Sequence, residues 1–153
     1  MDSLYDQDLV LWAEAQGRAL RAAAKAGGNA PIDWENVAEE IETLGRSERH
    51  ALGGHIAVVV EHLLKLQASP ASEPMRGWRD TIRRARQAIE DILDESPSLR
   101  REVGAVIARQ APRARALLRA NLDDYAETPR LDIDTLNYTE EQVLGDWFPE
   151  LTD

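Results

Sequence analysis

Apolar residues recur every three to four positions along four long stretches of the chain, which is the period of an amphipathic α-helix. The four predicted helices span about residues 6–26, 33–67, 77–95 and 98–125. Thr139 and Gln142 have capping-box spacing, so a short fifth helix is predicted to run from there to about Trp147. No stretch shows convincing strand alternation. The pattern predicts an all-α fold, an up-and-down bundle of four main helices plus a short C-terminal helix, in a single domain over residues 1–153.

Each main helix has an apolar stripe that is expected to face the core. The predicted inner residues of the first helix are Tyr5, Leu9, Trp12, Gln16, Ala19, Leu20 and Ala23. Those of the second are Trp34, Val37, Ala38, Ile41, Leu44, Gly45, Leu52, Ile56, Val59, Leu63 and Leu66. Those of the third and fourth are Trp78, Ile82, Ala85, Ile89, Ile92, Leu93, Leu99, Val103, Val106, Ile107, Ala114, Leu117, Leu118 and Tyr125. Trp12, Trp34 and Trp78 are therefore predicted to be structural core residues.

Two of the predicted helices contain glycine or proline in their interiors. Gly53 and Gly54 interrupt the second helix at a cost of about 1 kcal/mol each relative to alanine, and we expect the helix to continue through them. Pro112 removes one backbone hydrogen bond inside the fourth helix, so a kink is expected there.

The composition adds little to the fold but excludes several functions. Hydrophobic residues make up 43% of the chain and charged residues 30%, the balance of a soluble globular protein. The absence of cysteine excludes disulfides, thiolate metal sites and a cysteine nucleophile. The N-terminus lacks the basic and apolar regions of a signal peptide, and the longest apolar run is too short to span a membrane. A cytoplasmic protein is the expectation.

Charge is distributed unevenly along the chain. The net charge of −10 combines an acidic N-terminal half, an arginine-rich middle over residues 76–119 and an acidic C-terminus. An acidic protein with few aromatic residues is a poor candidate for nucleic-acid binding, but the arginine-rich middle leaves a local anion site open.

Several segments resemble one protein family. They are "YDQDLVLWAEAQ", "DWENVAEEIETLGRSER", "EHLLKLQ", "GWRDTIRRARQAIEDILDESPSLR" and "YTEEQVLGDWFPE", in that order. Together they are similar to domain-of-unknown-function family twenty-nine. The resemblance implies a small all-α bacterial protein without an assigned activity, and it supplies no catalytic residue.

Two oppositely charged strips form the main electrostatic feature. Glu35, Glu39 and Glu42 lie on one flank of the second helix, and Arg76, Arg79, Arg83 and Arg86 lie on the corresponding flank of the third. Antiparallel helices present such flanks to each other, so we expect an ion-pair network between the strips. The alternative is that the four arginines bind a partner, through a phosphate or an acidic segment.

Glu48, His55 and His62 are the candidate metal ligands, because glutamate and histidine both bind metals in helical bundles. They are seven residues apart, however, which separates neighbours by about 10.5 Å along a helix. Interhelical hydrogen bonds are the favoured role for the two histidines.

No catalytic residues are predicted. Ser47 lacks the turn that exposes a nucleophilic serine, and neither glycine pair follows a strand as a phosphate-binding loop does. The sequence favours a non-enzymatic module with a protein-interaction or regulatory role, without a cofactor, that binds an unknown protein partner or itself. The opposing hypothesis is a metal-assisted hydrolase that uses the Glu48, His55 and His62 cluster.

Overall fold

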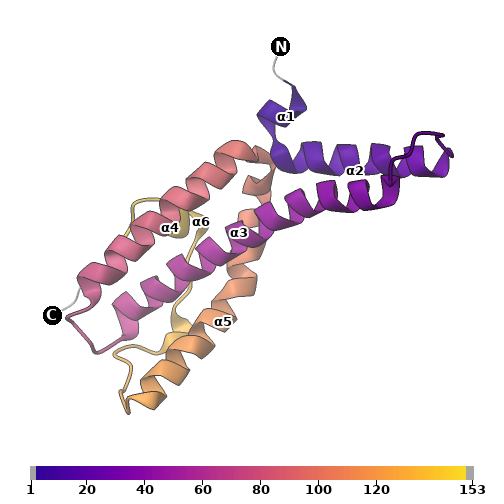
Figure 1. The fold of residues 1–153 in the computed structure, drawn as a ribbon. Helices are drawn as coiled ribbons and strands as arrows, with labels where there is room; N and C mark the ends of the chain where they lie inside the picture. Colours follow the sequence, from indigo (N-terminus) through magenta and orange to yellow (C-terminus); the bar gives the residue numbers. More distant parts are fainter. Residues whose placement is uncertain (1–2, 151–153) are drawn as a thin grey trace. The chain divides into compact units, whose positions relative to one another are not determined.

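The computed structural model describes residues 3–150, and these residues form helices and connecting loops without a strand (Figure 1). The α-helices are α1 (Leu4–Gln7), α2 (Leu9–Lys25), α3 (Trp34–Ala68), α4 (Met75–Glu95), α5 (Val103–Asp124) and α6 (Glu140–Leu144). Two 3₁₀ helices, η1 (Pro97–Glu102) and η2 (Ile133–Thr135), lie between them. The all-α fold class is confirmed. No helix among the described residues combines the length and apolar character needed to cross a membrane.

The first predicted helix is divided in two. Asp8 has extended backbone angles, ends α1 and caps α2, and its carboxylate accepts a hydrogen bond from the backbone N–H of Leu11 at 2.8 Å. The backbone N–H of Ser98 also donates to this carboxylate, at 2.7 Å. Burial by itself raises the pKa of Asp8, but these hydrogen bonds outweigh it and lower the pKa below its ordinary value.

The prediction that the second helix continues through its glycine pair is confirmed, because α3 is helical throughout. A Cβ atom on Gly53 would lie 3.6 Å from the side-chain nitrogen of Gln110, in ordinary contact with α5, whereas one on Gly54 would meet nothing within 4 Å. Gly53 therefore lies at a packed surface of the helix and Gly54 at an open one.

The chain divides into two compact units. The first unit comprises the chain up to Ala51 together with Ile92–Arg101, and the second comprises Leu52–Asp91 together with the chain from Glu102 onward. Both α3 and α4 contribute to each unit. A single domain over residues 1–153 stays a prediction.

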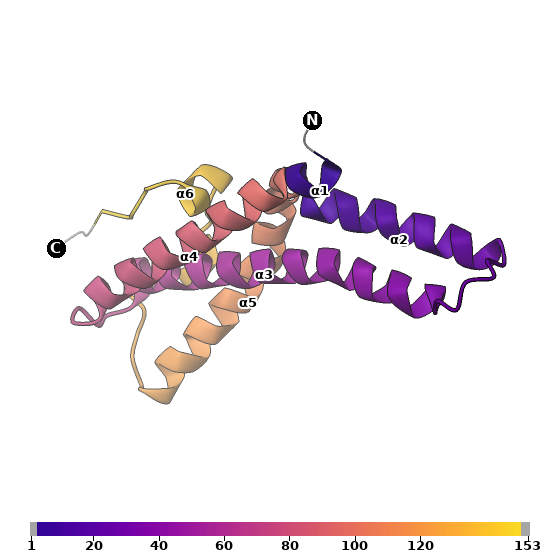
Figure 2. The same ribbon diagram turned by 45° about the horizontal axis from the view of Figure 1, so that its top comes forward.

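The first unit is built on an antiparallel hairpin of α2 and the first half of α3 (Figure 2). The two helices approach each other closely at small residues. A Cβ atom on Gly17 would lie 2.5 Å from Cγ of Glu42, and one on Gly45 would lie 3.8 Å from Cβ of Ala13. Gly17 is therefore opposite Glu42, and Ala13 is opposite Gly45.

The predicted inner stripe of the first helix is wrong in phase. The buried residues of α2 are Val10, Ala13 and Gly17, whereas Tyr5, Gln16 and Ala19 are exposed. On α3, Val37 and Leu44 are also exposed although both were predicted to face inward. The tryptophans Trp12, Trp34 and Trp78 are partly buried and none belongs to the fully buried core. The reason is that the hairpin contact uses small residues, which let the helices approach and leave the larger apolar residues on its flank.

The second unit contains the larger core. In it α4 runs antiparallel to the second half of α3 (Figure 1), and α5 approaches α3 where Gln110 faces Gly53. The predicted inner residues of this part are largely buried, among them Ile56, Leu63, Ile82 and Ile89. Leu117 and Tyr125 are exceptions, at 54% and 76% exposure. The short α6 begins with the predicted capping box, in which the hydroxyl of Thr139 accepts a hydrogen bond from the backbone N–H of Gln142.

Candidate functional site

The arginine row of α4 holds the C-terminal segment of the second unit. Arg86 is only 8% exposed. Its Nε donates a hydrogen bond to the backbone carbonyl of Val143 at 2.9 Å, and its Nη2 donates to the carbonyls of Gln142 at 2.8 Å and Trp147 at 2.7 Å. Burial lowers the pKa of Arg86, and the nearby Asp146 opposes that shift. The guanidinium is thus used to fasten α6 and the residues after it to α4.

Phe148 completes this arrangement. The guanidinium carbons of Arg79, Arg83 and Arg86 lie 5.0, 5.1 and 4.9 Å from the centre of its ring. These distances are within the range of cation–π attraction, which is about 6 Å. Three positively charged groups of one helix therefore lie around a single apolar ring. The arginines that carry them are three or four residues apart in the sequence.

A cavity of about 510 Å³ adjoins the ring. It is lined by Arg83, Arg86, Gln87, Glu90, Leu144, Asp146 and Phe148. Its wall therefore carries positively and negatively charged side chains as well as an apolar surface. We call the cavity together with Arg79 the arginine–phenylalanine site.

The other arginines of the candidate row differ in their surroundings. Arg83 forms an ion pair with Asp80 at 3.3 Å, and both side chains are more than half exposed. Such a pair contributes little to stability because water solvates both partners. Arg76 is exposed on the first turn of α4. Arg79 and Arg83 are the members of the row that can contact another molecule beside Phe148.

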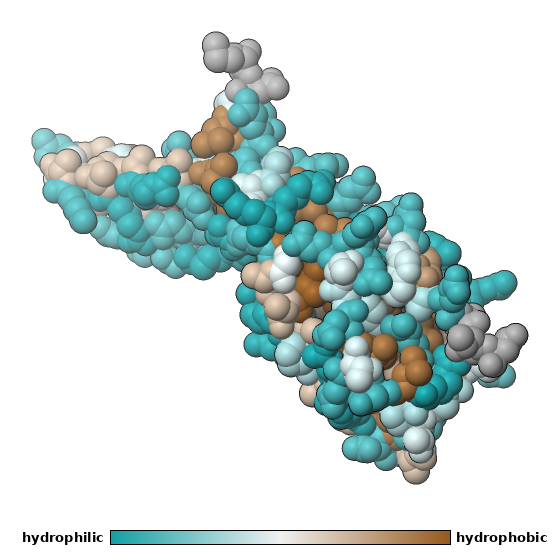
Figure 3. All heavy atoms as spheres, turned by 180° about the vertical axis from the view of Figure 1, so that it is seen from behind, coloured by the Kyte–Doolittle hydropathy of each residue, from teal (hydrophilic) through white to brown (hydrophobic). Residues whose placement is uncertain are grey.

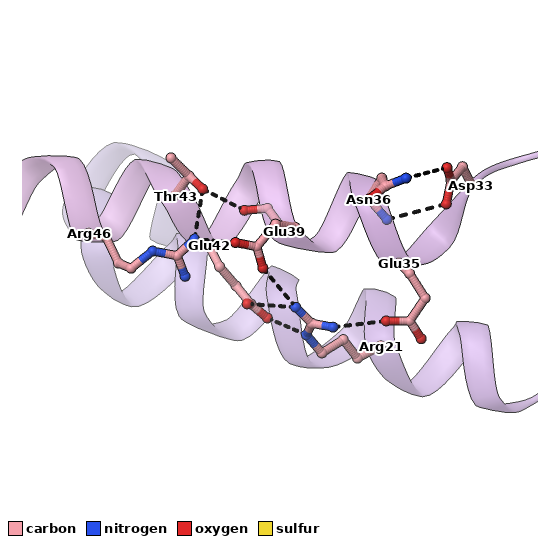
Figure 4. Close-up of polar contacts among 8 residues, drawn as sticks. All are labelled: Arg21, Asp33, Glu35, Asn36, Glu39, Glu42, Thr43 and Arg46. Atoms are coloured by element: carbon pink, nitrogen blue, oxygen red, sulfur yellow. Dashed lines mark hydrogen bonds and ion pairs between the residues drawn. The ribbon is translucent and has the colours of Figure 1, made fainter.

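The predicted pairing of the glutamate strip with the arginine row is wrong. In the first unit Arg21 of α2 reaches three glutamates of α3: Nη1 lies 2.8 Å from Glu35, Nη2 lies 3.2 Å from Glu39, and Nε lies 2.8 Å from Glu42 (Figure 4). Arg46 also pairs with Glu39, at 2.6 Å. The hydrogen bond from Arg21 lowers the pKa of Glu42 below its ordinary value.

The prediction was wrong because it used only the angular positions of the two strips around their helix axes. It did not take into account their positions along those axes. The loop between α3 and α4 turns after Ala68, so Arg83 lies level with residues near Glu61. Glu42 is a further 19 residues along α3, about 28 Å away at 1.5 Å per residue. The arginine that does lie level with Glu42 is on α2.

The candidate metal ligands are not gathered at one place. Among residues 3–150 no group of three or more histidine, aspartate and glutamate side chains is arranged so that it can hold a metal ion. Nδ1 of His62 lies 2.8 Å from the backbone carbonyl of Val58, to which it can donate, and burial lowers the pKa of this histidine. The geometry of Glu48, His55 and His62 gives no support to the hydrolase hypothesis.

Glu48 nevertheless has unusual surroundings in the first unit. Its Oε2 is buried and has no hydrogen-bond partner among the described residues. Burial, together with the nearby carboxylate of Glu95, raises the pKa of Glu48. Two carboxylates without a third ligand are not a metal site, but the raised pKa of Glu48 makes the stability of the first unit depend on pH.

Comparison with known proteins agrees with this helical architecture. Residues 4–148 match the family described as "Domain of unknown function DUF29". The chain belongs to the DUF29 family. A crystal structure of an alpha-helical protein of unknown function from Rhodospirillum rubrum is similar to it, with a TM-score of 0.71, 22% sequence identity, and coverage of 94% of this chain and 90% of that chain. At that identity the similarity establishes the fold. No curated protein is detectably similar in sequence.

The arginine row of this DUF29 chain is evident from its sequence, but the residue that lies against the row is not. Phe148 was visible in the motif "DWFPE", and the spacing of Arg79, Arg83 and Arg86 marked one face of a helix. Nothing in the sequence places residue 148 over residue 86. The role of Arg21 was also missed, because it is one of two arginines in an alanine-rich helix and forms no charged row.

Proposed function

We propose that this DUF29 protein is a non-enzymatic, cytoplasmic helical module that binds another protein, and that the arginine–phenylalanine site receives an acidic segment of that partner. The observation that carries the proposal is the convergence of three guanidinium groups on the Phe148 ring beside a cavity of about 510 Å³. Cavities of this kind, with apolar walls and a few oriented polar groups, are the usual form of a binding site.

The chemistry of the wall indicates the kind of segment. Arg79 and Arg83 can donate paired N–H groups to a carboxylate, the geometry that arginine recognises best. Phe148 and Leu144 offer an apolar surface for a neighbouring side chain, and Glu90 and Asp146 can accept hydrogen bonds from backbone N–H groups. A peptide with an acidic residue next to an apolar one satisfies all three kinds of group.

The same wall disfavours nucleic acid. Two carboxylates line the cavity, and the chain as a whole has a net charge of −10. A phosphate backbone would be repelled by both, and the affinity of proteins for nucleic acids depends mainly on positive charge.

Arg86 has a separate role in this proposal. Its three hydrogen bonds to backbone carbonyls hold the segment that carries Phe148, so it shapes the site without being free to bind a partner. Arg79 and Arg83 are the residues to change in a binding test, because changing them leaves this fastening in place.

The test is co-purification with the untagged protein from its own cells, comparing wild type with Arg83→Glu and Arg79→Glu. Arg113→Glu on the exposed surface of α5 is the matched control, since it makes the same change in charge. We expect one or more proteins to be retained by wild type and Arg113→Glu and lost with both site variants. Isothermal titration with an acidic peptide of the recovered partner should then show binding that weakens as salt is raised. Equal retention by all four proteins would contradict the proposed site.

A further inference from the structure

The second unit has another cavity, beside the end of α5, and none of the described residues lines both it and the arginine–phenylalanine site. Its volume is about 320 Å³, near the lower end of the range of small-molecule pockets, which is roughly 300–1,000 Å³. Trp78 of α4 and three residues in or directly after α5, Leu118, Leu122 and Tyr125, form much of its apolar wall. We call this cavity the α5-end pocket.

The apolar surface of the second unit is exposed in small areas. On the face of the molecule drawn in Figure 3, apolar atoms of this unit form small patches among hydrophilic atoms. Surfaces that bind another protein usually offer a larger continuous apolar area. Together with the volume of the α5-end pocket, this favours a small molecule as its occupant.

Hydrogen bonds hold the wall of the α5-end pocket in place. The backbone N–H of Arg130 donates to the carbonyl of Ala68 at 2.7 Å, and its Nη2 donates to the carbonyl of Leu66 at 3.0 Å, so the segment after α5 is fastened to the end of α3. Ser69 lines the pocket and is only 5% exposed, and its hydroxyl accepts a hydrogen bond from the backbone N–H of Ala71 at 3.3 Å. A wall that is already ordered binds a ligand without the cost of ordering it.

A strained residue separates two residues of the wall. Ala126 has a φ of 53°, in the left-handed region that residues other than glycine rarely adopt. The backbone N–H of Glu127 donates to the carbonyl of Leu122 at 2.8 Å, which closes the end of α5. Tyr125 and Glu127, on either side of Ala126, both line the pocket. Strained residues cluster at binding sites, where the surrounding structure holds them in place.

The charges at the pocket favour a positively charged ligand. Lys65 lines the pocket but lies 3.0 Å from Glu61, in a pair whose side chains are only 19% and 23% exposed. Glu127, in contrast, forms no ion pair with any residue between positions 3 and 150. The last turn of α5 contains Asp123 and Asp124 and no basic residue, and the C-terminus of a helix carries a partial negative charge. The charge of Lys65 is thus neutralised by a neighbour, whereas that of Glu127 is available to a ligand.

Two aromatic side chains of the wall favour the same kind of ligand. Tyr125 is 76% exposed although its place in the apolar stripe predicts burial, and Trp78 is partly buried. The faces of tyrosine and tryptophan rings attract cations, and tryptophan does so most strongly. Aromatic rings beside an unpaired carboxylate are the chemistry that recognises an ammonium group.

We infer that the α5-end pocket binds a small organic cation, an ammonium group carried on a short apolar chain. Glu127, Tyr125 and Trp78 hold the ammonium group, and the apolar chain packs against Leu118 and Leu122. The net charge of −10 attracts such a cation to the protein.

The first arm of the test varies the ligand and needs no substitution in the protein. Isotope-labelled full-length protein is titrated with choline, with n-butylammonium, and with the neutral analogue of choline in which carbon replaces nitrogen. Binding is followed by the shift of the indole N–H signal of Trp78, which is identified with Trp78→Phe. We expect both cations to shift this signal at millimolar concentrations, and choline to bind at least about fivefold more tightly than its neutral analogue. Equal affinities for choline and the analogue, or no shift with either cation, would overturn the inference.

The second arm varies the protein. Glu127→Gln and Tyr125→Leu should each weaken choline binding by about two- to fivefold, and Tyr125→Phe should retain it because the ring face remains. Glu141→Gln on the exposed surface of α6 makes the same change in charge as Glu127→Gln and is its matched control. If Glu141→Gln weakened binding as much as Glu127→Gln, choline would be attracted to the acidic surface in general and the pocket would not be its site.

Unchanged binding by both Glu127→Gln and Tyr125→Leu would also overturn the inference. None of these outcomes bears on the arginine–phenylalanine site, because the two sites share none of the described residues.

Discussion

The two units differ in how fully they bury their apolar residues, although α3 runs through both. Of the 25 apolar residues that are buried within residues 3–150, six belong to the first unit and 19 to the second. Nine large apolar residues of the described part of the chain are exposed, and six of them are in the first unit: Leu4, Tyr5, Leu11, Ile32, Val37 and Leu44. In the second unit α4 and α5 both pack against α3, so adjacent residues such as Leu63 and Leu64 are both buried. When only two helices pack together, each buries one stripe of residues against the other. A third helix is needed to cover the residues on either side of that stripe.

The units also use arginine differently. Arg21 in the first unit joins three glutamates at a surface where its side chain is 39% exposed. Arg86 in the second unit is buried and bonded to backbone carbonyls. A solvated ion pair is screened by water and salt, whereas a buried guanidinium leaves unsatisfied acceptors if it is removed. The same side chain therefore links two helices loosely in one unit and fastens a terminal segment in the other.

The largest expected effect compares the same substitution in the two halves of α3. Leu63→Ala should lower the free energy of unfolding by about 2–5 kcal/mol, because it opens a cavity in a closed core. Leu44→Ala should cost less than about 1 kcal/mol in dilute protein, because this leucine is already 42% exposed. Urea denaturation measures both. Equal losses would mean that the first unit is as well packed as the second.

The next effect compares the two arginines. Arg86→Gln should lower the free energy of unfolding by about 2–3 kcal/mol, since three carbonyls lose their donor. It should also increase hydrogen exchange at the backbone amides of α6. Arg21→Gln should cost less, and its effect should shrink in high salt because its partners are solvated. If Arg86→Gln left the exchange of α6 unchanged, Arg86 would not be what holds the terminal segment.

The smallest effect separates two glutamates of α3 by the sign of their pH dependence. Burial and Glu95 raise the pKa of Glu48 above its ordinary 4.5, so the folded state holds the proton of this carboxyl more tightly than the unfolded state does. The folded state therefore loses stability as pH rises from 4.5 through the raised pKa. Glu48→Gln should therefore raise stability at pH 7 and have little effect at pH 4.

The hydrogen bond from Arg21 lowers the pKa of Glu42. The contribution of Glu42 to stability is therefore present above pH 4.5 and disappears as pH falls through the lowered pKa. Glu42→Gln should accordingly reduce stability at pH 7. Thermal melts at several pH values test both signs, and like signs for the two variants would contradict these surroundings.

Local patterns predicted much of the fold, and they failed where a neighbouring element decides the outcome. The capping box at Thr139 and the continuity of α3 were predicted correctly, because hydrogen bonds within a few residues determine them. The inner face of α2 was predicted wrongly, because periodicity favours the large residues Leu9 and Trp12 whereas the hairpin packs on Ala13 and Gly17. For the candidate site, the arginine row was visible in the sequence but Phe148 was not connected with it.

The sequence by itself determined the helical class, the main helix boundaries and the acidic surface, since each follows from the period, the capping residues and the charge of short segments. Only the tertiary structure decided which side of each helix is covered and which charges meet. Those outcomes depend on the level at which two helices pass each other, which is set by loops and by the closest-packing residues. For this reason Glu42 meets Arg21 and not Arg83, Arg86 meets the carbonyls of the terminal segment, and the apolar residues Val37 and Leu44 remain at the surface.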